Sequence, residues 1–204
     1  MSNERQIGLR RADLERLTAT RKVAFALACA ERLIPSYQRL AVLTGRGQPQ
    51  VLTSSLERLW SDVLDEHHST DVELAILLDG VMNQVPREDD EHWIPEQAAA
   101  EDSAAAVAYA IRCSRTGLAQ EAAWAARRAY EAQDHQVLEA EKVEIAEPGA
   151  DLQVLLHLSV QAELGRQQRD LNELLRGDAR DETELLRVVR HRSRAEAGIA
   201  LASS

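Results

Sequence analysis

The chain has 204 residues, of which 45% are hydrophobic and 28% are charged. These are the proportions of an ordinary soluble globular protein, and they exclude an intrinsically disordered chain, a collagen and a disulfide scaffold. Acidic side chains outnumber basic ones by 34 to 24, which gives a net charge of −10. Because this charge repels phosphate backbones, nucleic acid is not expected as a ligand.

No stretch of the sequence has the length of apolar residues that a membrane helix requires. The longest uninterrupted apolar run is the eight residues 23–30, whereas a transmembrane helix needs about 20. The first residues are not followed by the apolar segment of a signal peptide. Both cysteines, Cys29 and Cys113, lie in apolar helical patterns, which favours reduced thiols. We therefore expect a cytoplasmic protein without a membrane anchor.

Helical signals dominate the composition. Aromatic residues make up 3% of the chain, and it contains only nine glycines and five prolines. Alanine and leucine abound, while runs of β-branched residues are missing, so strand signals are nearly absent. The sequence therefore predicts an all-α fold with seven or eight helices in a single domain, residues 1–204.

The first two expected helices differ in how completely they are apolar. The first spans about residues 12–33, and its central stretch 23–30 is apolar on every side, as in a helix that is covered all round. Pro35 suits the first turn of a short second helix that ends near residue 43, because its missing N–H group is not needed there.

The next two expected helices have clear start signals. A third helix, about residues 49–67, begins at a proline and carries an apolar stripe. The stripe consists of Leu52, Leu56, Leu59, Trp60, Val63 and Leu64. Thr70 and Glu73 have the spacing of a capping box at the start of a fourth helix, and Pro86 is expected to end it.

The second half of the chain begins with an irregular segment. Residues 87–96 lack helical periodicity and are interpreted as a possible domain waist or functional loop. Four further helices are expected over about residues 97–116, 118–144, 150–176 and 181–197. The first two are rich in alanine and are joined near Gly117 as an αα-hairpin. Trp124 lies on an apolar stripe of the second and is expected in the core, and Leu155 on the third is expected to be buried. Residues 198–204 are expected to form a frayed tail.

The sequence lacks the motifs of the common enzyme classes. It contains no Walker loop, dinucleotide glycine fingerprint, Gly-x-Ser-x-Gly elbow or His-Glu-x-x-His motif. His67 and His68 precede Asp71 and Glu73, but a loop break separates the two pairs, so we interpret them as a solvated helix terminus. The other histidines are isolated along the chain. The sequence therefore indicates no catalytic residue, no metal and no cofactor.

Four polar residues are candidates for lining a pocket. Glu31 and Arg32 directly follow the apolar centre of the first helix, so their charges must either reach solvent or be buried with partners. Tyr37 and Asp102 are the other two candidates. A purely structural interpretation stays open for all four. The charges of Glu31 and Arg32 would only end a helix, and Tyr37 would pack its ring while its hydroxyl stays in water. Asp102 lies near the start of an expected helix, where its negative charge would interact favourably with the helix dipole.

An acidic run forms the second group of candidates. Glu88, Asp89, Asp90 and Glu91 combine a high charge density with a position outside the expected helices. Trp93 follows them, and tryptophan is favoured as an anchor at protein interfaces. These five residues are expected to contact a partner protein if the chain has one.

Several short motifs resemble those of one protein family. They are Cys29-Ala30-Glu31-Arg32, Pro35-Ser36-Tyr37, the turn Thr44-Gly45-Arg46-Gly47, Leu56-Glu57-Arg58-Leu59-Trp60 and Ala99-Ala100-Glu101-Asp102. In order and spacing, over about residues 14–135, they resemble the YjaG-like family of uncharacterised bacterial all-helical proteins. Gln48-Pro49-Gln50 departs from the family pattern. The resemblance implies the fold and a cytoplasmic bacterial origin, and it implies no reaction.

Two classes of function are compatible with these observations. The first is a non-catalytic helical protein-binding protein, an adaptor or an immunity-type neutraliser, whose acidic surface recognises a protein partner of basic character. The second is an enzyme or small-ligand-binding protein with an inter-helical pocket around Glu31, Arg32, Tyr37 and Asp102. The lack of a catalytic constellation favours the first class. The sequence is also compatible with the formation of a homo-oligomer.

Overall fold

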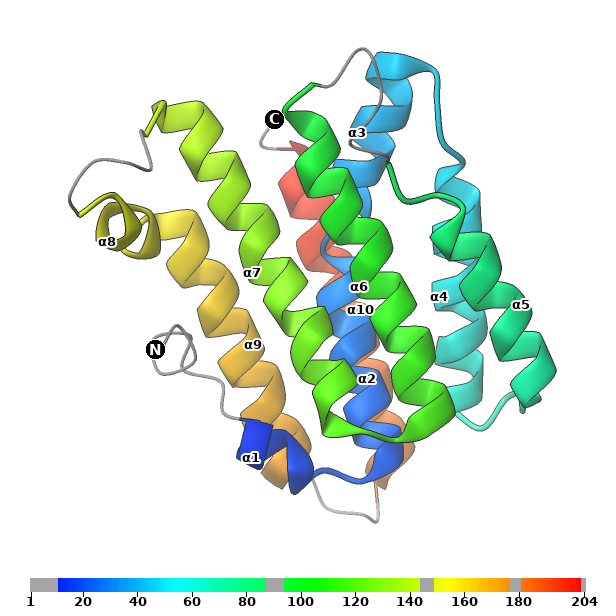
Figure 1. Cartoon of the computed structure of the whole chain (residues 1–204). Helices are drawn as coiled ribbons and strands as arrows, with labels where there is room; N and C mark the ends of the chain where they lie inside the picture. Colours follow the sequence, from blue (N-terminus) through cyan, green and yellow to red (C-terminus); the bar gives the residue numbers. More distant parts are fainter. Residues whose placement is uncertain (1–10, 87–93, 144–148, 177–180, 203–204) are drawn as a thin grey trace.

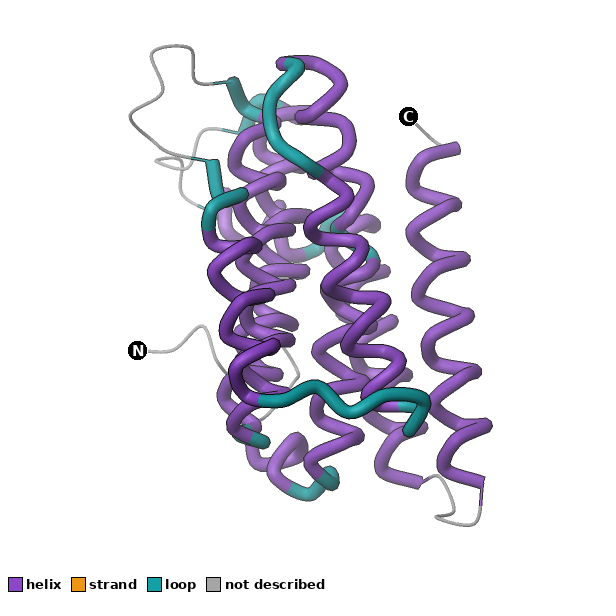
Figure 2. Tube along the Cα trace, turned by 90° about the vertical axis from the view of Figure 1, so that its right-hand side faces the viewer, coloured by secondary structure: helices purple, strands orange, loops and turns teal. Residues whose placement is uncertain are grey.

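The computed structural model describes residues 11–86, 94–143, 149–176 and 181–202 (Figure 1). In these residues every regular element is a helix and no strand occurs (Figure 2). The elements are α1 (Arg11–Glu15), α2 (Ala19–Glu31), α3 (Ile34–Thr44), α4 (Pro49–Val63), α5 (Asp71–Met82), α6 (Glu96–Thr116), α7 (Ala119–Glu141), α8 (Ala150–Leu155), α9 (Leu158–Arg176) and α10 (Glu182–Ala202). The predicted all-α fold is confirmed.

Two helices that the sequence predicts as continuous are interrupted. The first breaks before α2, where the side-chain oxygen of Thr18 accepts a hydrogen bond from the backbone N–H of Arg21 at 3.2 Å and caps the new helix. The other breaks between α8 and α9. There His157 Nδ1 accepts from the backbone N–H of Ser159 at 3.3 Å. Both breaks occur where a side chain satisfies a backbone donor at a helix start.

Several helix ends also differ from the expected positions. The helix α4 ends at Val63 rather than near residue 67, because Asp65 adopts a left-handed conformation with φ 62°. The helix α5 starts with the predicted capping box of Thr70 and Glu73 but ends at Met82, before Pro86. At the other end of the chain, α10 continues to Ala202, through most of the predicted tail.

The helix α2 lies at the centre of the bundle. It contacts α6, α7, α4, α9 and α10, and in Figure 1 it lies behind the α6–α7 hairpin, with α4 and α5 on one side and α9 on the other. Its middle residues 23–30 are buried, most of them with no exposed surface. The prediction of a helix covered on all sides is therefore confirmed.

Small side chains let α6 and α7 approach each other closely. The buried alanines of the hairpin include Ala100, Ala104, Ala122, Ala126 and Ala129. The main core formed around this hairpin also contains Phe25, Leu27, Leu56, Leu59 and Trp60, all buried as predicted. A second, smaller core of Val137, Val154 and Val160 joins the far end of α7 to α8 and α9.

Two apolar side chains are less buried than the sequence predicts. Trp124 is 38% exposed, and its ring lies against Tyr109 with the centroids 5.3 Å apart. Leu155 is only half-buried and packs against the edge of the small core, in which its neighbour Val154 is buried. The expectation that both side chains are buried in the core is therefore wrong. None of the described helices has the length and apolar character needed to cross a membrane.

Gly117 and Gly165 form a matched pair for testing the hairpin turn. Gly117 has φ +66°, and an added Cβ would meet Ala19 only at an ordinary 3.6 Å, so Gly117→Ala is expected to cost about 1–2 kcal/mol of backbone strain. Gly165 lies within α9 with no atom near an added Cβ. Gly165→Ala is therefore expected to stabilise the fold by up to about 1 kcal/mol. Urea unfolding measures both, and equal effects would contradict the turn geometry.

Candidate functional site

The guanidinium of Arg32 lies at the C-terminal end of α2 in the interior of the bundle. Its Nε and Nη2 donate hydrogen bonds to the two carboxylate oxygens of Glu163 at 3.0 and 2.9 Å, and its Nη1 donates to Asp170 at 2.8 Å. Nη2 also lies 3.6 Å from the sulfur of Cys29. Burial by itself would lower the pKa of Arg32, but the Glu163 and Asp170 carboxylates raise it well above its usual value, so the side chain stays charged.

The ion pairs continue from Arg32 across α9 and α10. The second oxygen of Asp170 accepts from Arg192 at 2.8 Å. One oxygen of Glu196 pairs with Arg169, while the other lies 3.6 Å from Arg32 Nη1, too far for a hydrogen bond. The buried charges are thus paired, as burial in a low dielectric requires. This network connects α10 to the centre of the fold.

Glu31 belongs to a separate cluster, although it is the neighbour of Arg32 in the sequence. Its carboxylate accepts hydrogen bonds from Ser193 Oγ at 2.9 Å and from Arg194 Nε at 3.0 Å. Burial raises the pKa of Glu31, and the Arg194 guanidinium opposes that rise. The side chain borders a cavity of about 280 Å³ beside α3, α4 and α10.

Tyr37 has a structural position on the other side of α3. Its ring is buried, and its hydroxyl donates to the backbone oxygen of Gln84 at 2.7 Å. A Cβ on Gly47 would lie only 2.7 Å from that hydroxyl, which shows how closely the turn after α3 packs on the ring. Burial raises the pKa of Tyr37, so the hydroxyl remains a donor that joins α3 to the residues after α5.

Asp102 is a buried carboxylate between α6 and α7. Its side chain is 1% exposed and accepts a hydrogen bond from Arg128 Nη1 at 2.9 Å. Its other oxygen lies 3.0 Å from His135 Nδ1. The hydrogen bond to Asp102 raises the pKa of His135, the nearby Asp134 and Glu131 carboxylates act in the same direction, and burial opposes them.

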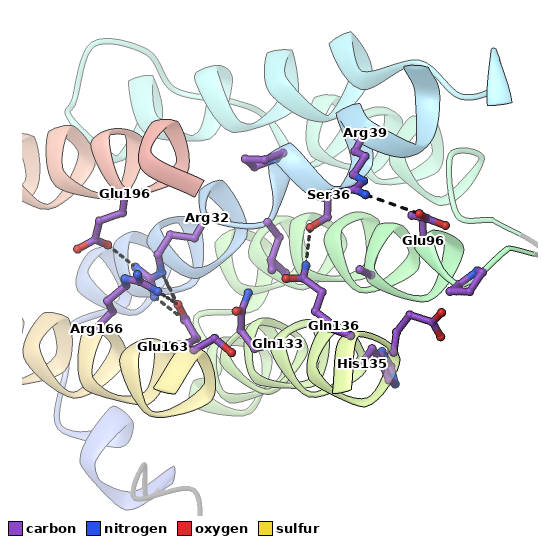
Figure 3. A pocket seen from close by; sticks show the side chains of 17 residues that line it. Arg32, Ser36, Arg39, Glu96, Gln133, His135, Gln136, Glu163, Arg166 and Glu196 are labelled. Atoms are coloured by element: carbon purple, nitrogen blue, oxygen red, sulfur yellow. Dashed lines mark hydrogen bonds and ion pairs between the residues drawn. The ribbon is translucent and has the colours of Figure 1, made fainter. Parts of the chain in front are cut away.

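A second cavity, larger than the one beside Glu31, opens between α3, α6, α7, α9 and α10 (Figure 3). Its volume is about 580 Å³. The buried ion pair of Arg32 and Glu163 lies at one end of it, and Arg166 approaches Glu163 there at 3.5 Å. At the other end Arg39 lies 3.9 Å from Glu96, and between the ends Gln136 donates to Ser36 at 3.2 Å. Charged and polar groups from five helices therefore surround one space.

The structure does not bring the four pocket candidates into one cavity. Arg32 lines the larger cavity and Glu31 the smaller one, whereas Tyr37 borders neither. Asp102 reaches the larger cavity only through its contact with His135. The acidic run with Trp93 lies outside the described residues, as does most of the expected waist; its last residue, Glu96, begins α6 and lines the larger cavity.

Sequence reasoning missed the residues that matter most for this cavity. His135 is isolated among the histidines, and its partner Asp102 lies 33 residues away. Glu163 and Arg166 are charged residues of α9 whose spacing is that of an ordinary solvated helix face. No local signal distinguishes Glu163, because its partner Arg32 lies 131 residues away in the sequence. Arg166 follows Glu163 at the three-residue spacing of an ordinary pair on one helix.

Cysteine chemistry and metal binding find no support in the described part of the chain. Both thiols are free and buried, and burial raises the pKa of Cys29 and brings that of Cys113 to about 12. Such thiols remain protonated and are poor nucleophiles. In the described ranges no three His, Cys, Asp or Glu side chains are grouped as metal ligands.

Comparison with known proteins identifies the family. A family model described as "Protein of unknown function (DUF416)" matches residues 10–199. The chain belongs to the DUF416 family. The crystal structure of a DUF416 family protein from Shewanella baltica is similar to it, with a TM-score of 0.76 and 20% sequence identity over 91% of this chain and 93% of that one. At this identity the likeness shows the DUF416 fold alone. A comparison with curated proteins finds no match.

Proposed function

We propose that this DUF416 protein binds a small polar ligand in the larger cavity. The observation that carries the proposal is the cavity itself, because about 580 Å³ lies within the range of small-molecule sites and polar groups converge on it from several helices. The Arg32–Glu163 pair at one end is buried and hydrogen-bonded. Such a preformed wall favours binding because little has to be ordered when a ligand enters.

The location and relatives of the protein are part of the same proposal. Free, buried cysteines are typical of a reducing compartment, which supports a cytoplasmic protein. The short motifs between residues 29 and 60 support a relationship to the YjaG-like bacterial proteins. Under this proposal the ligand is a small molecule of the cytoplasm.

The test compares two substitutions of exposed alanines by tryptophan. Ala140 lines the cavity on α7, whereas Ala195 is exposed on α10 and borders neither cavity. A panel of small polar metabolites is screened by ligand-observed NMR against the native chain and both variants. Compounds are expected to bind the native chain and Ala195→Trp but not Ala140→Trp, whose indole fills the cavity. A panel without binders, or binding that survives Ala140→Trp, would reject the proposal.

A protein-binding role is the second candidate, and an exposed apolar face favours it. Val72 and Ile76 lie one turn apart on α5 at the edge of the bundle, 68% and 66% exposed (Figure 1). Contiguous exposed apolar surface often marks an interface, and the net charge of −10 suits a basic partner. Replacing Val72 and Ile76 by aspartate should then abolish binding of the partner protein. Small molecules that bind in the larger cavity should still bind to this variant.

A further inference from the structure

We infer that residues 190–198 of α10 form a lid, held on the bundle by charged contacts, that opens as a unit while the rest of the fold stays closed. Figure 2 shows α10, the helix that ends at the C-terminus, at the edge of the bundle. Glu196 borders the larger cavity, and Arg194, Ala197 and Gly198 border the smaller one. Opening of the lid therefore changes the walls of both cavities at once. Such a motion requires no ligand, so it stands apart from the proposed function.

The apolar contacts of α10 with the core end just before the lid begins. Leu186 and Val189 are 2% and 1% exposed and belong to the main core, against which Leu185 also packs. The lid itself reads Arg-His-Arg-Ser-Arg-Ala-Glu-Ala-Gly and contains no large apolar side chain. Of residues 190–198, all of which the structure describes, only Ser193 is buried. Because the burial of apolar surface is the main favourable contribution to folding, the lid is held less firmly than the first half of α10.

Charged contacts on two sides take the place of apolar ones. On the side of α4, Arg190 Nη2 donates a hydrogen bond to Glu57 at 2.6 Å, and Arg194 Nη2 donates to the other oxygen of the same carboxylate. On the side of α9, Arg192 Nη2 donates to Asp170 at 2.8 Å. The lid thus lies between acidic side chains of two helices, and its arginines bind both.

The contacts of the lid can be broken without leaving a charge buried and unpaired. Glu31, which binds two residues of the lid, borders the smaller cavity and gains water when the lid moves away. Asp170 keeps its hydrogen bond of 2.8 Å to Arg32. The side chains of Glu57 and Arg169, which also pair with the lid, are already 56% and 43% exposed. Opening therefore avoids the large cost of breaking a buried ion pair from one side.

The hydrogen bonding between the lid and the bundle is incomplete. Arg190 Nε, Arg192 Nε and Glu196 Oε2 are buried and have no hydrogen-bond partner among the described residues. Arg190 does contact the ring of Trp60, but its guanidinium carbon lies 6.0 Å from the ring centre, at the outer limit of a cation–π contact. Buried polar groups without a partner favour states in which they reach water. The lid should therefore open at a lower free energy than the helices of the core.

Salt is expected to open the lid selectively. Some of its ion pairs are exposed to solvent, as in the pair of Arg194 and Glu57, whose side chains are 40% and 56% exposed. The attraction between exposed charges extends over about 10 Å at 0.1 M salt and over only about 3 Å at 1 M. The core contacts of Leu186 and Val189 involve no charge, so salt does not screen them. The two halves of α10 should therefore respond differently, with the boundary near Val189.

Amide hydrogen exchange of the full chain, followed by NMR at about 0.05 M and about 1 M sodium chloride, measures the opening. A helical segment as short as the lid is not stable by itself in water, so its amides exchange once it leaves the bundle. We expect the amides of residues 190–198 to exchange about tenfold faster at the higher salt concentration. The amides of α2 report unfolding of the whole chain, and their exchange should not change.

Two glutamates that each pair with two arginines provide the matched variants. Glu57 binds two arginines of the lid. Glu131 on α7 also pairs with two arginines, but both belong to α7 itself. Glu57→Gln should speed the exchange of the lid about fivefold at low salt and reduce its salt dependence, because two exposed ion pairs are lost. Glu131→Gln should leave the exchange of the lid unchanged.

Three results would overturn the inference. If residues 190–198 stay as protected as α2 at both salt concentrations and in Glu57→Gln, no lid opens. If the faster exchange extends equally to residues 183–189 and to α2, the whole chain unfolds instead. If Glu57→Gln and Glu131→Gln have equal effects on the lid, its charged contacts do not hold it. None of these results bears on the binding of compounds in the larger cavity, which Ala140→Trp tests separately.

Discussion

Replacing Arg32 with methionine is expected to lower the free energy of unfolding by about 3–5 kcal/mol, the cost of breaking a buried ion pair from one side. The substitution keeps the volume of the side chain similar but leaves the carboxylates of Glu163 and Asp170 buried without their main partner. Both carboxylates are about as buried as the arginine itself. An unpaired charge in such a place cannot recover its lost hydration.

Urea unfolding of Arg32→Met measures this loss, and Arg127→Met is the matched control. Arg127 pairs with Glu131 on the surface of α7, with its side chain 64% exposed, so its removal should cost less than about 1 kcal/mol. Equal losses in the two variants would show that the Arg32 network does not hold α9 and α10 to the centre of the fold.

Shortening Leu59 to alanine is expected to cost about 2–5 kcal/mol, because the space left in a close-packed core refills only partly. Leu59 has no exposed surface and lies on the buried face of α4, next to Trp60. The control is Val42→Ala, since Val42 is 85% exposed at the end of α3 and its loss should change stability by less than about 0.5 kcal/mol. A loss below about 1 kcal/mol for Leu59→Ala would place this stripe outside the core.

The fold class and several helix boundaries could be predicted from the sequence because their causes are local. Thr70 and Glu73 satisfy each other's backbone groups within one turn, so their spacing alone predicts the start of α5. Gly117 ends α6 in a left-handed conformation that glycine adopts without strain. The interruptions at Thr18 and His157 also have local causes, but the apolar periodicity continues across them and hides them.

The sequence by itself determined which faces of the helices are buried, and only the tertiary structure decided which charged groups meet. Apolar periodicity reports that a face must leave water, and this suffices to place Leu59 and the centre of α2 in the core. It does not say what a buried charge will bind, because Glu163 lies 131 residues from Arg32 and Asp102 lies 33 residues from His135. Such pairs depend on which helices pack together and in what register, a property of the whole bundle rather than of any one segment.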